Sequence, residues 1–280
     1  MLKQNEFYKM SGAGNDFVVV DNRNGLYNSF DFSHLARLVC QRRFGVGADG
    51  MIFIENSKKA NIKARIFNSD GSEAEFCGNG LRCSARFALL KVIAGRRMTI
   101  EIMNQVVDAE VLLDGNVLLE FQIINNKPNL KELYLQGKKI KGYFLKVGVP
   151  HFIVFVKEIE KAPVLSLGSI LRRHPDFGKE GTNVHFIELK DEQPFKYRTF
   201  ERGVEGETLA CGSGAVAIAI LLKFTFNKPS PLKLLTRSNK ILEVNIKKDR
   251  FQSLQISLIG DAFFVYKGNF SDEFLQGGYK

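Results

Sequence analysis

Apolar and polar residues alternate with a period of two along much of the chain, and many of the apolar residues are β-branched or aromatic. This pattern is typical of short β-strands that are buried on one face. The predicted strands are Phe17–Val20, Ile62–Phe67, Met98–Met103, Val117–Ile123, Phe152–Val156, Tyr197–Phe200 and Ile241–Ile246.

Four segments show a helical pattern instead. Ser33–Arg42 begins near a candidate N-cap, Asp31 or Ser33, and a shorter helix is expected at Leu167–Arg173 before a proline. Two longer helices are predicted at Asn79–Val92 and Gly212–Phe224. Both are rich in Ala and Leu and are apolar around most of their circumference, which predicts that they are buried.

The polar stretch Asn125–Asn129 interrupts both periodicities and is the best candidate for a linker. It divides the chain into an N-terminal domain, residues 1–124, which holds Cys77, and a C-terminal domain, residues 125–280, which holds Cys211. We expect the last ~18 residues to pack back on the N-terminal domain, since the two ends of a domain often lie close together.

The two halves share a short motif. Cys77-Gly-Asn-Gly precedes the first long helix, and Cys211-Gly-Ser-Gly precedes the second about half a chain later. A repeat at this distance suggests duplication of a domain. The predicted fold is therefore two similar α+β domains that each wrap strands around one buried helix.

Composition narrows the class of protein. The 280 residues include 40 Lys+Arg against 30 Asp+Glu, for a net charge of +10, but the basic residues are scattered among acids, which disfavours a nucleic-acid partner. The longest apolar run, Ala215–Leu222, is far shorter than the roughly 20 residues that span a bilayer. No secretory signal is recognisable, so no membrane partner and a cytoplasmic location are expected.

Four cysteines are too few for a disulfide scaffold, and their spacing does not match a zinc site, so no metal is predicted. A cysteine at a helix N-terminus has its pKa lowered from about 8.5 to as little as 3.5–7.5. The N–H groups there also bind anions such as carboxylates. If the two domains face each other across a cleft, Cys77 and Cys211 would lie on opposite faces of a substrate carbon. One thiolate would remove a proton and the other thiol would return one, which inverts the carbon.

An isolated buried cysteine is more often an inert core residue, and Cys40 and Cys83 are assigned that role. Two matched copies of the motif favour chemistry for Cys77 and Cys211. The glycine-rich segments Ser11–Asp16 and Gly45–Gly50 lack the residues of a dinucleotide or phosphate loop, so neither predicts a nucleotide site.

Five motifs make the chain recognisable: KMSGAGNDF, IFNSDGSEAEFCGNGLR, GVPH, GTNVHF and FERGVEGETLACGSGA. Together, and in this order, they resemble the diaminopimelate epimerases. The resemblance implies an isomerase that interconverts LL- and meso-diaminopimelate without pyridoxal phosphate or another cofactor, in lysine and peptidoglycan precursor synthesis. It also implies the family's α+β fold of two pseudo-symmetric domains, each a β-barrel-like sheet wrapped around a central helix, and a homodimer.

The resemblance assigns roles to individual residues. Cys77 and Cys211 match the two catalytic bases, and His151 and Glu201 match residues that support catalysis. The remaining matched positions bind substrate: Asn15, Asn68, Gly78, Asn79, Asn183, Glu201, Arg202, Gly212 and Ser213.

Three departures from the family pattern concern the substrate and not the thiols. Val149 stands where many members have Asn, Gly50 replaces a Gln found in some, and the loop ERGVEGET is one residue longer than usual. The loss of a polar contact at Val149 predicts looser recognition of the far end of the substrate. We therefore expect some activity on shorter amino diacids such as glutamate.

Two related enzymes are the alternatives. A proline or hydroxyproline racemase of the same fold would carry His in place of Asn79. A phenazine-biosynthesis isomerase is thiol-independent, which does not suit a chain with both Cys77 and Cys211.

Overall fold

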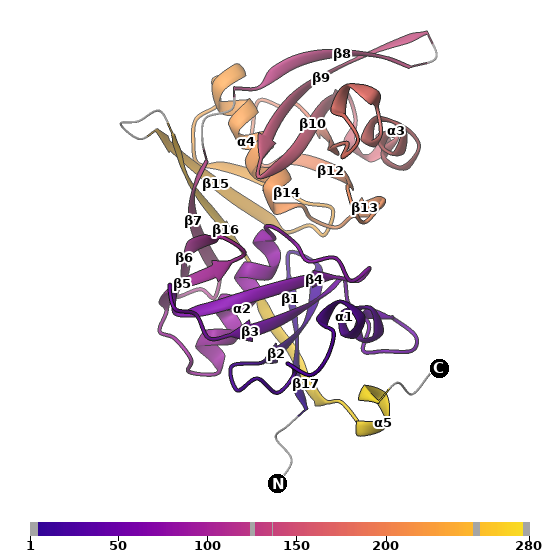
Figure 1. Cartoon of the computed structure of the whole chain (residues 1–280). Helices are drawn as coiled ribbons and strands as arrows, with labels where there is room; N and C mark the ends of the chain where they lie inside the picture. The colour runs from indigo at the N-terminus through magenta and orange to yellow at the C-terminus, as the bar shows by residue number, and fades with distance from the viewer. Residues whose placement is uncertain (1–4, 124–126, 136, 249–252, 277–280) are drawn as a thin grey trace. The chain divides into compact units, whose positions relative to one another are not determined.

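A computed structural model of the chain describes residues 5–123, 127–135, 137–248 and 253–276 (Figure 1). The chain forms two compact units, one of Met1–Val117 with Asp261–Lys280 and one of Leu118–Gly260. The division falls before the expected boundary at residue 124, because strand β7 (Val117–Ile123) pairs with β16 (Leu254–Gly260) of the second unit. Within the expected linker, residues 125 and 126 lie outside the described part, and Asn129 begins strand β8.

The first unit is a mixed sheet in the order β17-β1-β2-β3-β4-β5-β6. The pairs β2/β3 and β4/β5 are parallel and the other pairs are antiparallel. The strands are β1 (Glu6–Gly12), β2 (Asn15–Asp21), β3 (Gly50–Glu55), β4 (Ile62–Asn68), β5 (Arg97–Ile102), β6 (Gln105–Val111) and β17 (Phe263–Asn269). The helices are α1 (Phe32–Cys40), α2 (Gly78–Leu90) and α5 (Asp272–Leu275).

The second unit has the order β7-β16-β15-β14-β12-β11-β10-β9-β8, with β13 also paired to β12. Its further strands are β8 (Asn129–Leu135), β9 (Lys138–Val147), β10 (Val149–Val156), β11 (Asn183–Glu188), β12 (Phe195–Glu201), β13 (Gly206–Thr208), β14 (Leu232–Leu235) and β15 (Ile241–Lys248). Its helices are α3 (Val164–Arg172) and α4 (Gly212–Thr225), with 3-10 turns at Ile159–Lys161 and Pro175–Phe177.

The two units repeat one topology. In each, a parallel strand pair (β2/β3, β10/β11) is connected through a helix, α1 or α3, and is followed by an antiparallel partner, β4 or β12. A second helix, α2 or α4, then leads to another parallel pair, β4/β5 or β12/β14. The internal repeat seen in the two C-G-x-G motifs thus extends to the strand order and direction of both units.

Helices α2 and α4 form the centres of the two units. Strands β1 to β6 and β17 contact α2, and β9, β10 and β14 to β16 contact α4. Ten of the fourteen residues of α4 are buried, so the helix is enclosed on all sides, as its apolar sequence predicts. No helix within the described part of the chain is long and apolar enough to cross a lipid bilayer.

Two histidines lie in the core of the second unit. His151 on β10 and His185 on β11 are wholly buried, and His151 Nδ1 lies 2.8 Å from His185 Nε2. Their rings stack with centroids 5.0 Å apart, and His185 Nδ1 lies 2.8 Å from Thr199 Oγ1. Burial lowers the pKa of His151 from 6.5 to about 3 and the pKa of His185 well below 6.5, so both imidazoles are neutral at pH 7.

This buried pair predicts a pH dependence of stability. Between pH 6.5 and 3, His151 is protonated in the unfolded chain but neutral in the folded chain. Acid therefore favours unfolding, and the stabilisation present above pH 6.5 is lost as the pH falls toward 3. We expect His151→Gln to make the free energy of unfolding fall less steeply from pH 7 to 4.5, with about one proton fewer taken up. Urea unfolding at several pH values measures this slope.

His34→Gln is the matched control, because His34 is exposed on α1 and its replacement removes a histidine without altering the buried pair. Equal slopes for the wild type and His151→Gln would contradict the prediction.

Candidate active site

Cys77 is the N-cap of α2. Its backbone is extended, with φ −138° and ψ 98°, and its carbonyl accepts the first helical hydrogen bond from the Leu81 N–H at 2.9 Å. The Gly80 N–H donates to Cys77 Sγ at 3.4 Å. The half-buried thiol therefore sits where the N–H groups and the dipole of the helix favour its anionic form.

Two of the substrate-binding positions expected in the first unit, Asn15 and Asn79, are in contact at this helix start, and Asn68 lies at the same end of the sheet as Asn15. Asn79, in the first turn of α2, donates from Nδ2 to Asn15 Oδ1 at 3.3 Å. Asn15 begins β2, and Asn68 ends β4 at the position paired with Gly50 of β3. Gly50 also pairs with Phe17, two residues after Asn15, so neighbouring strands bring Asn15 and Asn68 to the same end of the sheet.

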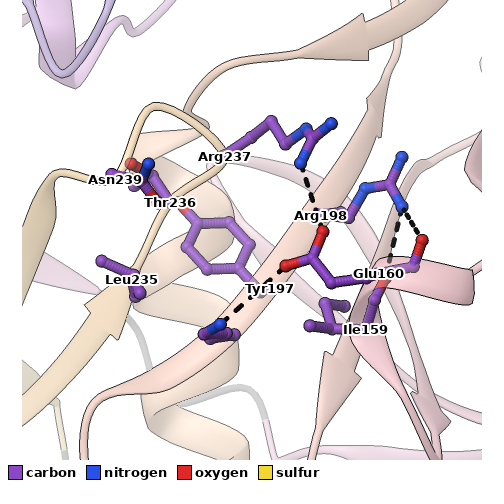
Figure 2. Close-up of a pocket in the computed structure, with 9 residues that line it drawn as sticks. Ile159, Glu160, Tyr197, Arg198, Leu235, Thr236, Arg237 and Asn239 are labelled. Carbon is purple, nitrogen blue, oxygen red and sulfur yellow. Dashed lines mark hydrogen bonds and ion pairs between the residues drawn. The ribbon is translucent and has the colours of Figure 1, made fainter.

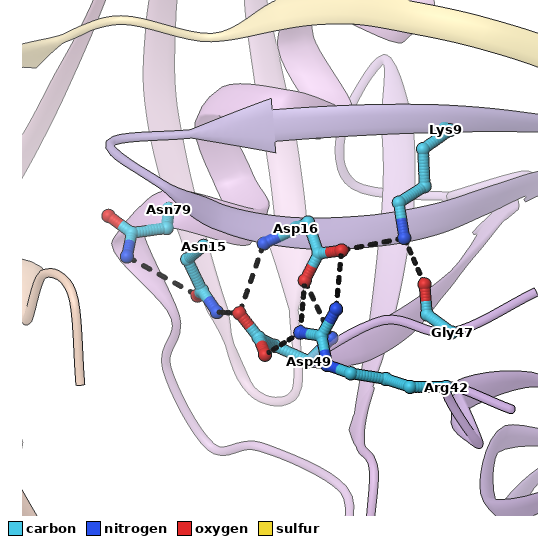
Figure 3. A network of polar contacts seen from close by, with 7 residues as sticks. All are labelled: Lys9, Asn15, Asp16, Arg42, Gly47, Asp49 and Asn79. Carbon is cyan, nitrogen blue, oxygen red and sulfur yellow. Dashed lines mark hydrogen bonds and ion pairs between the residues drawn. The ribbon is translucent and has the colours of Figure 1, made fainter. Parts of the chain in front are cut away.

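A charged network lies beside these amides (Figure 3). Asp49 Oδ2 accepts from Asn15 Nδ2 at 2.7 Å, and Asp49 Oδ1 accepts from Arg42 Nη2 at 2.7 Å. Arg42 also pairs with Asp16, which forms a second ion pair with Lys9 at 2.6 Å. Burial raises the pKa of Asp16, but hydrogen bonds from Lys9 and Arg42 outweigh it and hold that pKa below 3.8.

Cys211 is the N-cap of α4 in nearly the same conformation, with φ −123° and ψ 109°. Its carbonyl accepts from the Ala215 N–H at 2.9 Å and from the Tyr197 hydroxyl at 3.0 Å. Cys211 Sγ lies 3.7 Å from Ser213 Oγ. Unlike Cys77, Cys211 is buried, with 3% of its surface exposed.

The histidine pair lies against the start of α4. A Cβ on Gly214 would fall 2.3 Å from His185 Cε1, so the first turn of the helix approaches the ring as only glycine allows. The second glycine of the C-G-S-G motif therefore has a packing role. His151, the residue expected to support a thiol, stacks on this same ring.

The expected binding residues of the second unit lie at the ends of adjacent strands. Asn183 begins β11 and pairs with His151 of β10. Its Oδ1 accepts from the Arg202 N–H at 2.8 Å, and its Nδ2 donates to the Pro150 carbonyl at 3.2 Å. Glu201 is the last residue of β12 and directly precedes Arg202.

A small polar pocket that is open to solvent also lies in the second unit (Figure 2). Its cationic residues are engaged in ion pairs. Arg237 and Lys196 contact Glu160, and Arg198 contacts Glu207. Each cationic side chain of the pocket is therefore paired with a carboxylate, and none of the predicted site residues lines the pocket.

In the first unit, Asn15 contacts Asn79 in the first turn of α2. In the second unit, Asn183 pairs with His151, whose partner His185 packs against the first turn of α4. Cys40 and Cys83 are buried in the core as predicted, and burial raises the pKa of the Cys40 thiol to about 12. Sequence reasoning did not single out Asp49 or His185. His185 lies in the GTNVHF motif and Asp49 in the segment Gly45–Gly50, but neither segment indicates a partner for these side chains. Strand pairing brings them beside His151 and Asn15.

Comparison with known proteins shows the family of the chain. The family model "Diaminopimelate epimerase" matches residues 7–122 and 143–265. A diaminopimelate epimerase of Aquifex aeolicus is 41% identical over 97% of this chain and 99% of its own length. Another from Archaeoglobus fulgidus is 36% identical over 87% of this chain and 90% of its own length.

Solved structures share the fold at low sequence identity. A phenazine biosynthesis protein of the PhzF family from Bacillus anthracis is 18% identical, with a TM-score of 0.73, and covers 95% of this chain and 99% of its own. A probable proline racemase from Agrobacterium radiobacter is 14% identical, with a TM-score of 0.71, and covers 96% of this chain and 94% of its own. Proteins with different names thus share this fold. The sequence match to the diaminopimelate epimerases spans both cysteine motifs, and the chain belongs to the diaminopimelate epimerase family.

Proposed function

We propose that this enzyme interconverts LL- and meso-diaminopimelate with Cys77 and Cys211 as its two bases, in lysine and peptidoglycan precursor synthesis. The observation that carries the proposal is the matched pair of cysteine N-caps, with equivalent backbone conformations and first helical hydrogen bonds, in two units of the same topology. Membership of the family over nearly the whole chain supports the choice of substrate.

In the proposed reaction, the thiolate of one cysteine takes the α-proton and becomes a thiol. The electron pair of the broken C–H bond is delocalised into the adjacent carboxylate. The thiol of the other cysteine then donates its proton to the opposite face of the carbon and becomes a thiolate. Atoms and charge balance without a cofactor, because each turnover exchanges the protonation states of the two sulfurs.

Each helix start also suits the carboxylate of the reacting centre. The N–H groups of Gly78 and Asn79 precede the first helical hydrogen bond of α2, and those of Gly212 and Ser213 do so in α4. Donors at this position and the helix dipole favour an anion. They would stabilise the negative charge that develops on the substrate when the α-proton leaves. Stabilisation of developing charge is usually the largest single contribution to catalysis.

The remaining residues are proposed to hold the far end of the substrate. Asn15 and Asn68 of the first unit, and Asn183, Glu201 and Arg202 of the second, offer amide, carboxylate and guanidinium groups. These pair with the ammonium and carboxylate groups of an amino diacid. Neutral His151 is proposed to support the Cys211 side, since its partner His185 lies against the first turn of α4.

A homodimer is proposed through strand β17. Four consecutive apolar residues of this strand, Phe263 to Tyr266, are each 40–49% exposed. Phe264 and Tyr266 contact aromatic rings of their own unit, and Phe263 and Val265 alternate with them along the strand. An exposed apolar strand favours burial against an identical strand of a second copy.

The two-base mechanism predicts the behaviour of single cysteine variants. In D2O, under reducing conditions and without pyridoxal phosphate, the wild type should invert LL-diaminopimelate and incorporate deuterium at the α-carbon. Cys77→Ala and Cys211→Ala should each lose inversion by at least ~10²-fold, because each lacks one acid or base. NMR of the α-proton and chiral chromatography measure the two processes.

Cys40→Ala is the matched control, since this thiol is buried in the core of the first unit. Unchanged inversion in either active-site variant, provided that each remains folded, would contradict the proposed roles.

The apolar side chain of Val149 leads to a separate prediction, about substrate specificity. This half-buried residue begins β10, two residues before His151. We expect the wild type to racemise L-glutamate slowly. We expect Val149→Asn to raise kcat/KM for diaminopimelate by up to about 10-fold, the value of one added hydrogen bond. A complete absence of glutamate racemisation at high enzyme concentration would contradict relaxed specificity.

The dimer proposal predicts that Phe263→Lys/Val265→Lys gives a monomer, because two buried charges would oppose association. Val106→Lys, at an exposed position of β6, is the matched control and should leave the dimer intact. Light scattering coupled to size exclusion measures the mass. A monomeric wild type at all concentrations, or a dimer in the double variant, would refute this interface.

A further inference from the structure

Four polar side chains of the first unit form one continuous chain with a carboxylate at one end and a guanidinium at the other; Figure 3 shows the first three of them. Asp49 accepts from Asn15, Asn15 accepts from Asn79, and Asn79 accepts from Arg82 Nη2 at 2.8 Å. Arg82 is wholly buried, and its Nε donates to the Asp261 carbonyl at 3.1 Å. The chain therefore begins at a group that only accepts and ends at a group that only donates.

These ends fix the orientation of both amides between them. Because an ionised carboxylate has no hydrogen to donate, Asn15 must present Nδ2 to Asp49, which turns its Oδ1 toward Asn79. Because a guanidinium has no lone pair to offer, Asn79 must present Oδ1 to Arg82, which turns its Nδ2 toward Asn15. A flip of either amide would set two donors or two acceptors against each other.

Asp49 is suited to this position by all of its contacts. Its Oδ2 accepts from Asn15 Nδ2 and, at 3.2 Å, from the Asp16 N–H. Its Oδ1 accepts from Arg42 Nη2. Because donors face both terminal atoms of the side chain, both atoms must be acceptors. A carboxylate has two acceptor oxygens, whereas an amide has only one.

We propose that Asp49 is a positioning residue, which fixes the amide orientations of Asn15 and Asn79 for substrate binding. Its role in substrate binding rests on the proposed function of these two asparagines, whereas its effect on their orientation does not. The carboxylate side chain itself touches no reacting atom in this scheme. Its effect is to present Asn15 and Asn79 already ordered, so that less conformational freedom is lost when the substrate binds.

The test compares Asp49→Ala, Asp49→Asn and the double variant Arg42→Gln/Asp49→Asn. Asp49→Ala should raise KM for LL-diaminopimelate about 10-fold with kcat within threefold of the wild type, because ordering before binding is lost and the thiols are unaffected. Asp49→Asn should also raise KM, since its NH2 group must face either Arg42 or Asn15. In the double variant, the glutamine that replaces Arg42 can accept from that NH2 group, so KM should return toward the wild-type value.

A readout without substrate accompanies the kinetics. In the full-length protein labelled with 15N at asparagine side chains, the NH2 signals of Asn15 and Asn79 should be well dispersed in the wild type and the double variant. In Asp49→Ala the Asn15 signals should broaden or merge toward averaged positions. Asn15→Ala and Asn79→Ala assign the signals. Asp108→Ala, an exposed acid on β6, is the matched control for both measurements.

The outcomes separate this inference from the proposed function. A wild type that does not epimerise diaminopimelate but shows ordered amides that depend on Asp49 would refute the function and support the positioning of the amides. An active wild type in which Asp49→Ala leaves both KM and the amide signals unchanged would refute the positioning role. A double variant no better than Asp49→Asn would refute the acceptor requirement at residue 49.

Discussion

The structure depends on the burial of two helices together with their N-terminal ends. A helix start carries N–H groups that the helix itself does not satisfy, and inside a protein these groups require partners. Here each buried helix, α2 and α4, begins at a cysteine N-cap, and strands contact it along its length. In the proposed mechanism, the same N–H groups bind the substrate carboxylate and favour the thiolate form of the cysteine. Structure and chemistry thus arise from one feature of the fold.

The two units share a topology but surround their cysteines differently. Beside Cys77, charged residues order the amides of Asn15 and Asn79, and the thiol is half-buried. In the second unit, a neutral histidine pair lies in the core against the first turn of α4, and the Cys211 thiol is buried. The two units therefore share a cysteine at a helix start but not the polar groups that surround it.

The histidine pair and the charged network differ in how they limit the free-energy cost of burying polar groups. The histidine pair avoids the cost of burying charge, because desolvation keeps both rings neutral. The network of Lys9, Asp16, Arg42 and Asp49 retains its charges, because each carboxylate has a cation within hydrogen-bonding distance and Arg42 remains well exposed. Partial exposure reduces the cost of desolvation that a buried network would incur, so this network is better suited to orienting neighbours than to stabilising the fold.

The sequence by itself determined the elements with clear local signals. These include the apolar helices α2 and α4, the cysteines at their starts, the Asp31 cap of α1 and the alternating strand β7. It did not determine strands such as β3, where the run Met51–Ile54 is apolar on both faces and has no period to detect. Tertiary structure alone decided that β7 belongs with β16, that His185 stacks on His151, and that Asp49 orients Asn15. These relations join residues 34 to more than 130 positions apart, and pairing between strands, which no local pattern encodes, brings them together.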